Sequence, residues 1–322
     1  MSKRVSLSAL ALLLACGLQA APAQAQLSRT FVSSVNGNDA NDCNRPTPCR
    51  SFQVAHDKTN DQGEITVLDP GGYGTVAITK SISIVNDGVG EAGMLISGGA
   101  NGITINAPAN ASVNLRGLTV QGIGFGGGNG LFFNSGLALT VTNCVFRNHS
   151  GAAGGAIGNG MVLSPTVGGT HNLAISDTVV SDNSGHGIVV APTVAGQAIR
   201  IAIERAQIVN NGQDGFISAG SGGGTIDATI SNTTSANNGR FGFLSTGLDT
   251  VSTVMVVRSV SANNSTGLSI GGAAKLRVGQ SRIAGNTLHT WFGNGTLQSF
   301  GDNYIAGNAD GDPALPGTIA KK

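Results

Sequence analysis

Apolar and polar residues alternate along most of the chain in short runs, which are separated by turns rich in Gly, Asn, Ser and Asp. Several of these runs begin at a glycine, for example residues 187–190, 215–217 and 242–244. Alternation with a period of two is typical of short β-strands, and the residues between the runs favour turns. The pattern therefore predicts an all-β protein.

An asparagine recurs at a fixed place in a repeat of variable length. Seven residues serve as origins for the count: Val141, Ile175, Ile203, Ile230, Val256, Val278 and Phe300. Eight residues further along, six of the seven positions are asparagine and the first is His149; the six are Asn183, Asn211, Asn238, Asn264, Asn286 and Asn308. A constant offset within repeats of different length indicates a fixed core unit with a variable insert.

Stacking of this unit predicts a right-handed parallel β-helix with three short strands per coil and about ten coils, in which equivalent asparagines form one ladder. We assign residues 64–310 to this β-helix and 311–322 to a C-terminal tail. Residues 26–63 form an N-terminal segment and cap, in which the helical spacing of residues 51–58 predicts a helix over the open end of the coils.

The first residues have the pattern of a signal peptide. Lys3 and Arg4 precede an apolar run, and residues 23–25 have the small-x-small form of a signal-peptidase site. We assign residues 1–25 to this signal, which predicts export to the periplasm or out of the cell. Lipoprotein anchoring at Cys16 is the alternative. No later apolar run approaches the roughly 20 residues that span a bilayer, so no membrane span is predicted.

Cysteine positions agree with an exported protein. Cys43 and Cys49 flank a polar segment, and an oxidising compartment favours a disulfide between them. Cys144 falls three residues after Val141, in a column of small residues that is expected to face inward, so we predict a buried, inert thiol.

Composition excludes one class of partner. Charged residues make up 11% of the chain, its formal net charge is +1, and it has no run of Lys or Arg. Because binding to a phosphate backbone needs a basic surface, we predict no nucleic-acid partner.

The N-terminal third carries a family resemblance. Residues 31–55, with Gly37-Asn38-Asp39 and Pro48-Cys49-Arg50-Ser51-Phe52, and the following residues 63–74 resemble the first segments of the pectate-lyase-like β-helix superfamily. More narrowly, the chain is similar to exported bacterial β-helix proteins of unassigned activity. The resemblance implies the fold, but it implies little about function, because the superfamily contains lyases, hydrolases, epimerases, adhesins and structural proteins.

Enzymes of that superfamily use outward side chains of one strand per coil, and here the strand after each glycine has an uncharged outward column. Its members are Thr104, Phe132, Val189, Ile217, Leu244 and Ser269. Lyases and hydrolases of this kind need carboxylates. The column therefore argues against catalysis at that face, and as an apolar strip it needs a cover, either the chain's own loops or a partner.

Three further features have two interpretations each. His186, in a Gly-His-Gly element that resembles that of polygalacturonases, lies in a variable turn position and is expected to be an exposed turn residue. Residues 36–42 are rich in the oxygen ligands of calcium but lack the spacing of a defined loop, so a turn-rich cap is the preferred interpretation. Trp291 and Phe292 either stack on a sugar ring or, as we favour, plug the C-terminal end.

The densest group of ionisable residues is interpreted first as a solvated face, and as the alternative it supplies the candidate site. Asp177 and Arg205 are expected to pair across one coil, and the candidate catalytic residues are Arg200, Glu204, Arg205 and Asp227. The favoured hypothesis is a non-catalytic exported β-helix that binds a polysaccharide or another cell-envelope component. The alternative is a carbohydrate-active enzyme, a lyase, hydrolase or epimerase, that acts on an acidic polysaccharide.

Overall fold

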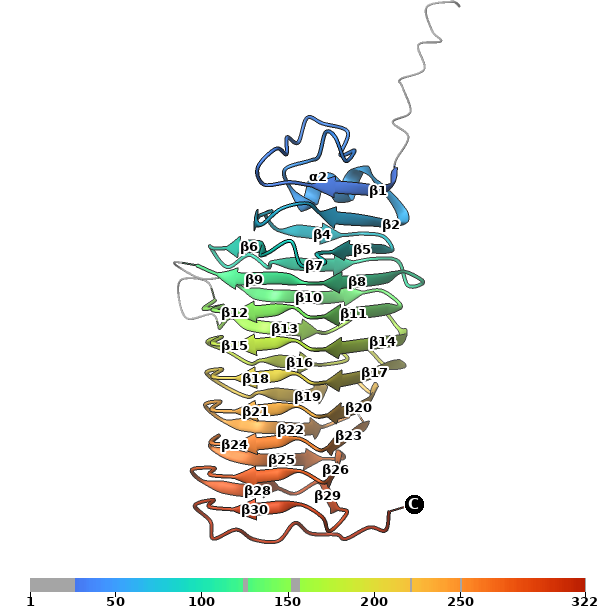
Figure 1. The fold of residues 1–322 in the computed structure, drawn as a ribbon. Coiled ribbons are helices and arrows are strands. Elements are labelled where there is room, and N and C mark those ends of the chain that lie inside the picture. Colours follow the sequence, from blue (N-terminus) through green and yellow to red (C-terminus); the bar gives the residue numbers. More distant parts are fainter. Residues whose placement is uncertain (1–26, 124–126, 152–156, 221, 250, 322) are drawn as a thin grey trace, which may run out of the picture.

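The computed structural model describes residues 27–321 except 124–126, 152–156, 221 and 250. The signal peptide assigned to residues 1–25 and the alternative lipid anchor at Cys16 lie outside the described residues. The described chain winds into a rod of three parallel sheets, and each complete coil contributes one strand to each sheet (Figure 1). The predicted parallel β-helix is confirmed.

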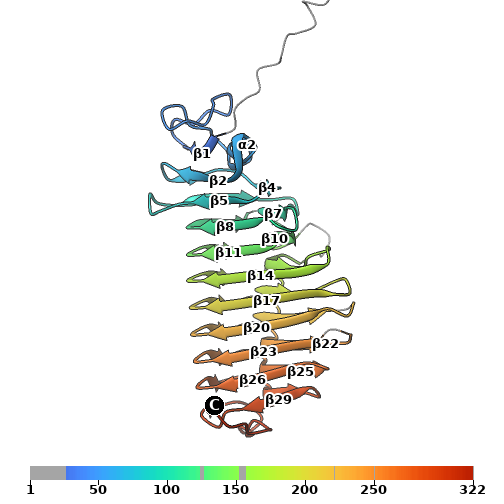
Figure 2. The ribbon, with the colours of Figure 1, turned by 90° about the vertical axis from the view of Figure 1, so that its right-hand side faces the viewer.

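Sheet A contains the longest strands and forms one side of the rod, where its strands stack in chain order (Figure 2). They are β1 (Leu27–Val32), β2 (Thr59–Val67), β5 (Ile82–Val85), β8 (Ser112–Arg116), β11 (Ala138–Thr142), β14 (Gly169–Ser176), β17 (Gln197–Glu204), β20 (Thr225–Ser231), β23 (Val251–Val257), β26 (Lys275–Gly279) and β29 (Thr296–Ser299).

Sheets B and C complete each coil. Sheet B contains β3 (Gly71–Gly72), β6 (Ala92–Ile96), β9 (Leu118–Gly122), β12 (Val145–Arg147), β15 (Val179–Ser181), β18 (Gln207–Val209), β21 (Thr234–Ala236), β24 (Val260–Ala262), β27 (Arg282–Ala284) and β30 (Tyr304–Ala306). Sheet C contains β4 (Val76–Ile78), β7 (Ile103–Asn106), β10 (Asn129–Ser135), β13 (Asn159–Leu163), β16 (Ile188–Val190), β19 (Phe216–Gly220), β22 (Phe241–Gly247), β25 (Thr266–Gly272) and β28 (His289–Gly293). The described strands thus make nine complete coils and a tenth of two strands, preceded by β1, which pairs with β2; this agrees with the about ten coils that the repeat predicts.

The core is a stack of apolar side chains at equivalent coil positions. Val141 pairs with Ile175 in sheet A, and Ile203 and Ile230 continue the column, all of them buried. The last coil departs from the predicted register, because Ser299 and not Phe300 pairs with Val278. Counted between paired residues, the turn from β29 to β30 is one residue longer than the equivalent turn from β26 to β27. A count backward from Asn308 with the usual offset of eight residues therefore reaches Phe300, one residue after the true column member Ser299.

The predicted asparagine ladder is present between sheets B and C. The Nδ2 of each asparagine donates to the Oδ1 of the next, over 2.8 Å from Asn183 to Asn211, 3.0 Å to Asn238, 3.0 Å to Asn264, 3.4 Å to Asn286 and 2.7 Å to Asn308. Each Oδ1 also accepts a backbone N–H of the preceding coil. His149 joins the ladder through its backbone N–H, which donates to Asn183, and burial lowers the pKa of its ring to about 4.

The polar column two residues after each origin lies in the turn from sheet A to sheet B. Its residues adopt left-handed backbone angles, with φ between 48° and 52° for Asn143, Asp177, Arg205, Asn232, Arg258 and Gln280. Asn and Asp tolerate this conformation best, so Arg205, Arg258 and Gln280 are the unusual members of the column.

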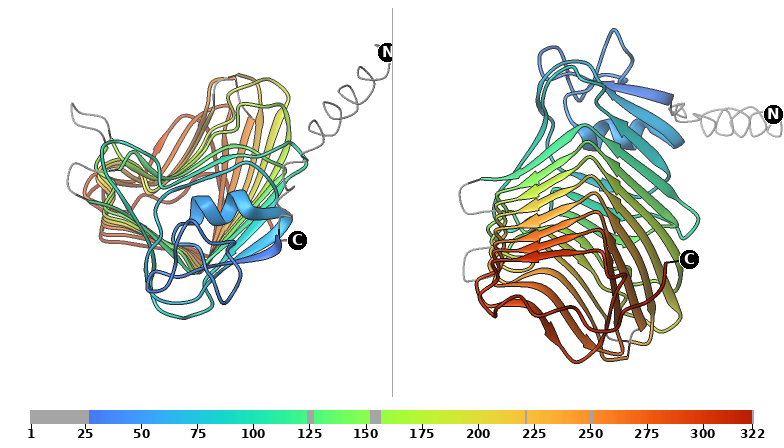
Figure 3. Two further views of the ribbon diagram at one scale, coloured as in Figure 1. Left: turned by 90° about the horizontal axis from the view of Figure 1, so that it is seen from above. Right: turned by 60° about the horizontal axis from the view of Figure 1, so that its bottom comes forward.

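Both ends of the rod are covered. Helix α2 (Phe52–Lys58) begins at Ser51, whose side chain accepts from the Val54 N–H, and seen from above it lies across the N-terminal coils (Figure 3). The predicted helical cap is confirmed. At the other end the Asp312 carboxylate accepts from the Asn308 side chain over 2.7 Å, and Thr318 bridges to Ser299.

The cysteines behave as predicted. Cys43 and Cys49 form a disulfide, and both are buried. Cys144 is a buried free thiol whose pKa burial raises to about 11. Helices that could cross a bilayer are absent from the part of the chain that the structure describes.

Candidate functional site

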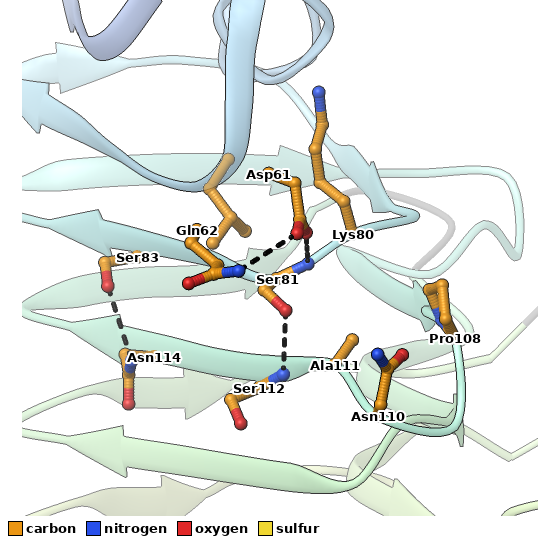
Figure 4. Close-up of a pocket in the computed structure, with 11 residues that line it drawn as sticks. Asp61, Gln62, Lys80, Ser81, Ser83, Pro108, Asn110, Ala111, Ser112 and Asn114 are labelled. Atoms are coloured by element: carbon orange, nitrogen blue, oxygen red, sulfur yellow. Dashed lines mark hydrogen bonds between the residues drawn. The ribbon is translucent and has the colours of Figure 1, made fainter.

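The outer face of sheet A has two hollows that lie next to each other along the rod. The first, of about 710 Å³, is lined by Asp61, Gln62, Lys80, Ser81, Ile82, Ser83, Pro108, Asn110, Ala111, Ser112 and Asn114 (Figure 4). The second, of about 510 Å³, is lined by Ala138, Leu139, Thr140, Asn172, Leu173, Ala174, Arg200, Ile201, Ala202, Asp227 and Thr229. Strands β8 and β11, which carry lining residues of the first and the second hollow, are paired neighbours. We call the two hollows together the sheet A trough.

Hydrogen bonds between neighbouring strands hold the floor of the first hollow. Asp61 accepts from the Ser81 N–H over 2.9 Å, and the Ser81 hydroxyl accepts from the Ser112 N–H over 3.2 Å. Asn114 donates to the Ser83 hydroxyl over 3.3 Å, and Figure 4 shows these side chains on one face of the sheet. The floor therefore consists of hydroxyl, amide and carboxylate groups in fixed positions.

Lys80 provides a cation at the same hollow. Its Nζ donates to the Thr59 carbonyl over 2.6 Å, and partial burial lowers the pKa of the ammonium group. Sequence reasoning missed Lys80 and Asp61 because both precede the regular asparagine repeat that aligns the coils.

Arg200 and Asp227, two of the predicted site residues, lie on the trough. They occupy equivalent positions of the paired strands β17 and β20, and both side chains are exposed. Within the described residues neither of them forms an ion pair, so their charges face the solvent. The same hollow is also lined by the small side chains of Ala174, Ala202 and Thr229. The register therefore places these two candidates side by side, a neighbourhood that the sequence analysis did not single out.

Glu204 and Arg205, the other two candidates, lie at the rim where sheet A turns toward sheet B. The Arg205 guanidinium donates to Asp177 over 2.7 and 2.9 Å and lies 2.7 Å from Glu204. Its hydrogen bonds lower the pKa of Asp177, and the two carboxylates raise the pKa of Arg205. The predicted pairing of Asp177 with Arg205 is confirmed, and we call the three residues the rim cluster.

The structure therefore separates the four candidates into two pairs. Arg200 and Glu204 are four positions apart on an extended strand, a separation of about 13 Å. The trough holds Arg200 and Asp227, while the rim holds Glu204 and Arg205 with Asp177. A single reacting group could not contact all four side chains.

The predicted apolar column runs along the outer face of sheet C. Phe132 pairs with Val162, and the row continues through Val189, Ile217 and Leu244, all half-buried. Sequence reasoning omitted two members, Val162 within the row and Phe292 at its end; Phe292 pairs with Ser269 and is 56% exposed.

His186 is not the exposed turn residue that the sequence predicts. Its side chain is only 17% exposed, and its Nδ1 lies 3.0 Å from Oδ2 of Asp214, a carboxylate that is completely buried. Arg240 Nε lies 3.9 Å from the other oxygen of Asp214, which also accepts from the Phe241 N–H. The residue before each glycine stacks on its equivalent in the next coil, so the His186 ring and the Arg240 guanidinium both lie beside the buried Asp214 carboxylate.

The same turn positions in earlier coils hold asparagines. Asn129 donates to Asn101 over 3.0 Å, Asn159 donates to Asn129 over 2.9 Å, and the Asn159 side chain accepts from the His186 N–H. His186 and Asp214 thus continue a second polar ladder. Both residues directly precede a glycine that begins a sheet C strand, and this shared position is the sequence signal that could have predicted their contact.

The other two ambiguous features have defined positions. Asp39, in the Asn/Asp-rich segment 36–42, accepts from the N–H groups of Arg50 and Ser51, so its carboxylate holds the turn before α2. Across the described ranges, no group of three or more His, Cys, Asp or Glu side chains could hold a metal ion. Trp291 packs against the core at the C-terminal end, as predicted for a plug, whereas Phe292 faces outward.

Comparisons with known proteins identify the fold. No protein-family model and no curated protein matches the chain. The structure is similar to the crystal structure of pectate lyase Pel9A, with a TM-score of 0.61 and 17% identical residues over 94% of this chain and 82% of that one. A rhamnogalacturonan lyase also matches, with a TM-score of 0.49 and 14% identity over 88% of each chain. The first likeness confirms a pectate-lyase-like right-handed parallel β-helix, as the sequence predicts.

Proposed function

We propose that this chain is an exported β-helix protein that binds a polysaccharide along the sheet A trough without catalysing its turnover. The observation that carries the proposal is the shape and lining of the trough, two adjoining hollows of about 710 and 510 Å³ on one sheet face. Its strands are about 4.8 Å apart, so an extended polymer that crosses them meets similar side chains at regular intervals.

The chemistry of the lining fits a carbohydrate. Ser112 and Asn114 in the first hollow, and Thr140 and Thr229 in the second, supply hydroxyl and amide groups that can exchange hydrogen bonds with sugar hydroxyls. The short side chains of Ala174 and Ala202 leave space for a ligand above this part of the sheet. The similar solved protein is a pectate lyase, which also supports a polysaccharide partner.

Export is part of the proposal and rests on two supports. The Cys43–Cys49 disulfide is stable in an oxidising compartment, and the N-terminal residues have the pattern of a signal peptide.

A steric variant tests binding at the trough. The protein lacking residues 1–25 is screened on a glycan array, and the affinity for the best polysaccharide is measured by calorimetry. Ala202→Trp, at an exposed position on the trough floor, is expected to weaken binding at least tenfold, or about 1.4 kcal/mol. Ala306→Trp, at an exposed position of sheet B, is the matched control. Unchanged affinity of Ala202→Trp, or no glycan bound at all, would contradict the proposal.

A second candidate function, a carbohydrate-active enzyme that acts on an acidic polysaccharide, is favoured by the rim cluster. Asp177 and Glu204 both contact one guanidinium group, so their carboxyl groups lie within the about 10 Å that separates catalytic pairs in glycosidases. Polygalacturonate and alginate are incubated with the protein, and new reducing ends and unsaturated products are measured. Turnover that Glu204→Gln abolishes and Arg258→Lys leaves intact would establish the enzyme and refute the binding-only proposal.

A further inference from the structure

The C-terminal end of sheet C presents an aromatic surface that the sheet A trough does not include. Phe292 in β28 is 56% exposed, and one face of its ring stacks on His289 with centroids 5.3 Å apart and an interplanar angle of 16°. Because His289 covers only one face of the ring, the other face remains available for contact.

Phe241 stands beside this ring and is held by Arg240, whose Cζ lies 5.0 Å from the Phe241 ring centroid. Phe241 and Phe292 both line two hollows, one of about 690 Å³ and one of about 220 Å³. The larger hollow falls within the range of about 300–1,000 Å³ of small-ligand sites, which are mostly apolar with a few polar groups.

The larger hollow has an apolar floor and an uncharged polar edge. Leu244 and the two phenylalanines form the floor, while Thr246 and Asn294 stand at the edge. The Asn294 Oδ1 accepts from the Gly272 N–H over 3.2 Å, and the hydrogens of its amide group are left for another acceptor. All residues that line this hollow are uncharged.

A glycine keeps the edge open. A Cβ on Gly271 would lie 3.0 Å from the Thr246 hydroxyl and 3.9 Å from Asn294 Oδ1, so a side chain there would stand between the two polar groups. Gly271 has no left-handed backbone angle, and a larger residue is therefore compatible with its conformation.

We propose that this hollow binds a neutral sugar ring, at a second site independent of the proposed polysaccharide trough. The apolar C–H face of a pyranose packs on the free face of Phe292, and its hydroxyls exchange hydrogen bonds with Thr246 and Asn294. A uronate ring is disfavoured because the lining of this hollow has no cation to replace the hydration that a carboxylate would lose; the neighbouring cation, Arg240, stacks on Phe241 and lines the smaller hollow instead.

The chain contains its own reporter for this site. Trp291 is its single tryptophan and lines the larger hollow, so a ligand that enters the hollow changes the surroundings of the only indole. The protein lacking residues 1–25 is titrated with cellohexaose, xylohexaose and mannohexaose, and with hexagalacturonate for comparison, while Trp291 emission is recorded. At least one neutral oligosaccharide is expected to give a saturable change that hexagalacturonate does not give.

Variants test whether the response arises from a sugar bound in this hollow. Phe292→Ala and Gly271→Leu are expected to weaken the response at least tenfold, whereas Tyr304→Ala, which removes a 74% exposed aromatic residue of sheet B, leaves it unchanged. Arg200→Ala, in the trough, also leaves the response unchanged, so failure of one proposal is distinguishable from failure of the other. Circular dichroism checks that each variant is folded.

Three results would overturn the inference. These are no response of Trp291 to any neutral oligosaccharide, a response that Phe292→Ala retains in full, and an emission change caused by protein concentration alone. If protein concentration alone changes the emission, and sedimentation detects dimers that Phe292→Ala abolishes, the aromatic surface would be assigned to self-association instead.

Discussion

Replacement of Asn238 with alanine tests whether the ladder stabilises the coils as the hydrogen-bond geometry requires. The Asn238 side chain is 3% exposed and donates to the Ile208 carbonyl over 3.2 Å and to Asn264 over 3.0 Å. Its Oδ1 accepts from both the backbone N–H and the Nδ2 of Asn211, over 3.1 and 3.0 Å. Its Nδ2 also donates to the Ser235 hydroxyl over 3.2 Å, and alanine removes all five bonds without removing any of the partner groups.

The magnitude follows from the partners that are left behind. The Ile208 carbonyl and the two Asn211 donors lose their bonds to this side chain inside the rod, and an unsatisfied buried polar group costs about 1–3 kcal/mol. Because water or a shift of the neighbouring coils can recover part of this loss, we expect destabilisation of at least about 3 kcal/mol, the lower end of the sum for three groups.

Urea denaturation monitored by far-ultraviolet circular dichroism measures this change as a shift of the midpoint at constant slope. Asn172→Ala, on the exposed outer face of β14, is the control and is expected to change stability by less than about 0.5 kcal/mol. A loss below about 1 kcal/mol for Asn238→Ala, similar to that of the control, would refute the reasoning, because the ladder amides would then be replaceable by water.

Three further predictions concern titration, reactivity and buried charge. Hydrogen bonds from the backbone N–H of Asn308 and then from its side chain lower the pKa of Asp312. The carboxylate therefore stabilises the C-terminal end above its unfolded pKa of about 3.9, and this stabilisation is lost as the pH falls through the lower folded pKa. In that pH range amide exchange in β30 should accelerate in the native chain but not in Asp312→Ala, which lacks the carboxylate at every pH. Cys144, with a pKa of about 11, should react with a disulfide reagent at about pH 8 only after unfolding. His186→Ala removes the ring nitrogen that lies 3.0 Å from Asp214 Oδ2, while Arg240 and the Phe241 N–H remain at the other carboxylate oxygen; calorimetric melting should show a loss of about 1–3 kcal/mol, whereas an unchanged melting temperature would contradict the pairing.

Local signals in the sequence were sufficient for the architecture. Each coil must place an asparagine under the asparagine of the coil before it, so Asn183 and Asn211 mark the same place in repeats of different length. The Cys43–Cys49 bridge and the Ser51 cap of α2 also depend on residues a few positions apart. The bridge and the cap are readable because their partners are close in sequence, and the ladder is readable because its asparagines recur at one place in every repeat.

The candidate site was only partly accessible in this way. Equivalent coil positions placed Arg205 beside Asp177, since register alone decides this contact, whereas the adjacent positions of Arg200 and Asp227 became clear only from the strand pairing. The first hollow of the trough could not be predicted, because Asp61 and Lys80 reach it from coils that lack the asparagine.

The sequence by itself determined the periodic part of this protein, namely the coil, the ladder and, except in the last coil, the inward or outward direction of the strand residues in the asparagine repeat, because stacking repeats one local environment along the axis. Only the tertiary structure decided how deeply individual groups are buried. Asp214 is fully enclosed and His186 nearly so, while Phe292 remains open to solvent, although all three lie in or beside the strands of one sheet. Burial depends on the packing of adjacent coils and of the loops between them, whose lengths and paths the repeat does not encode.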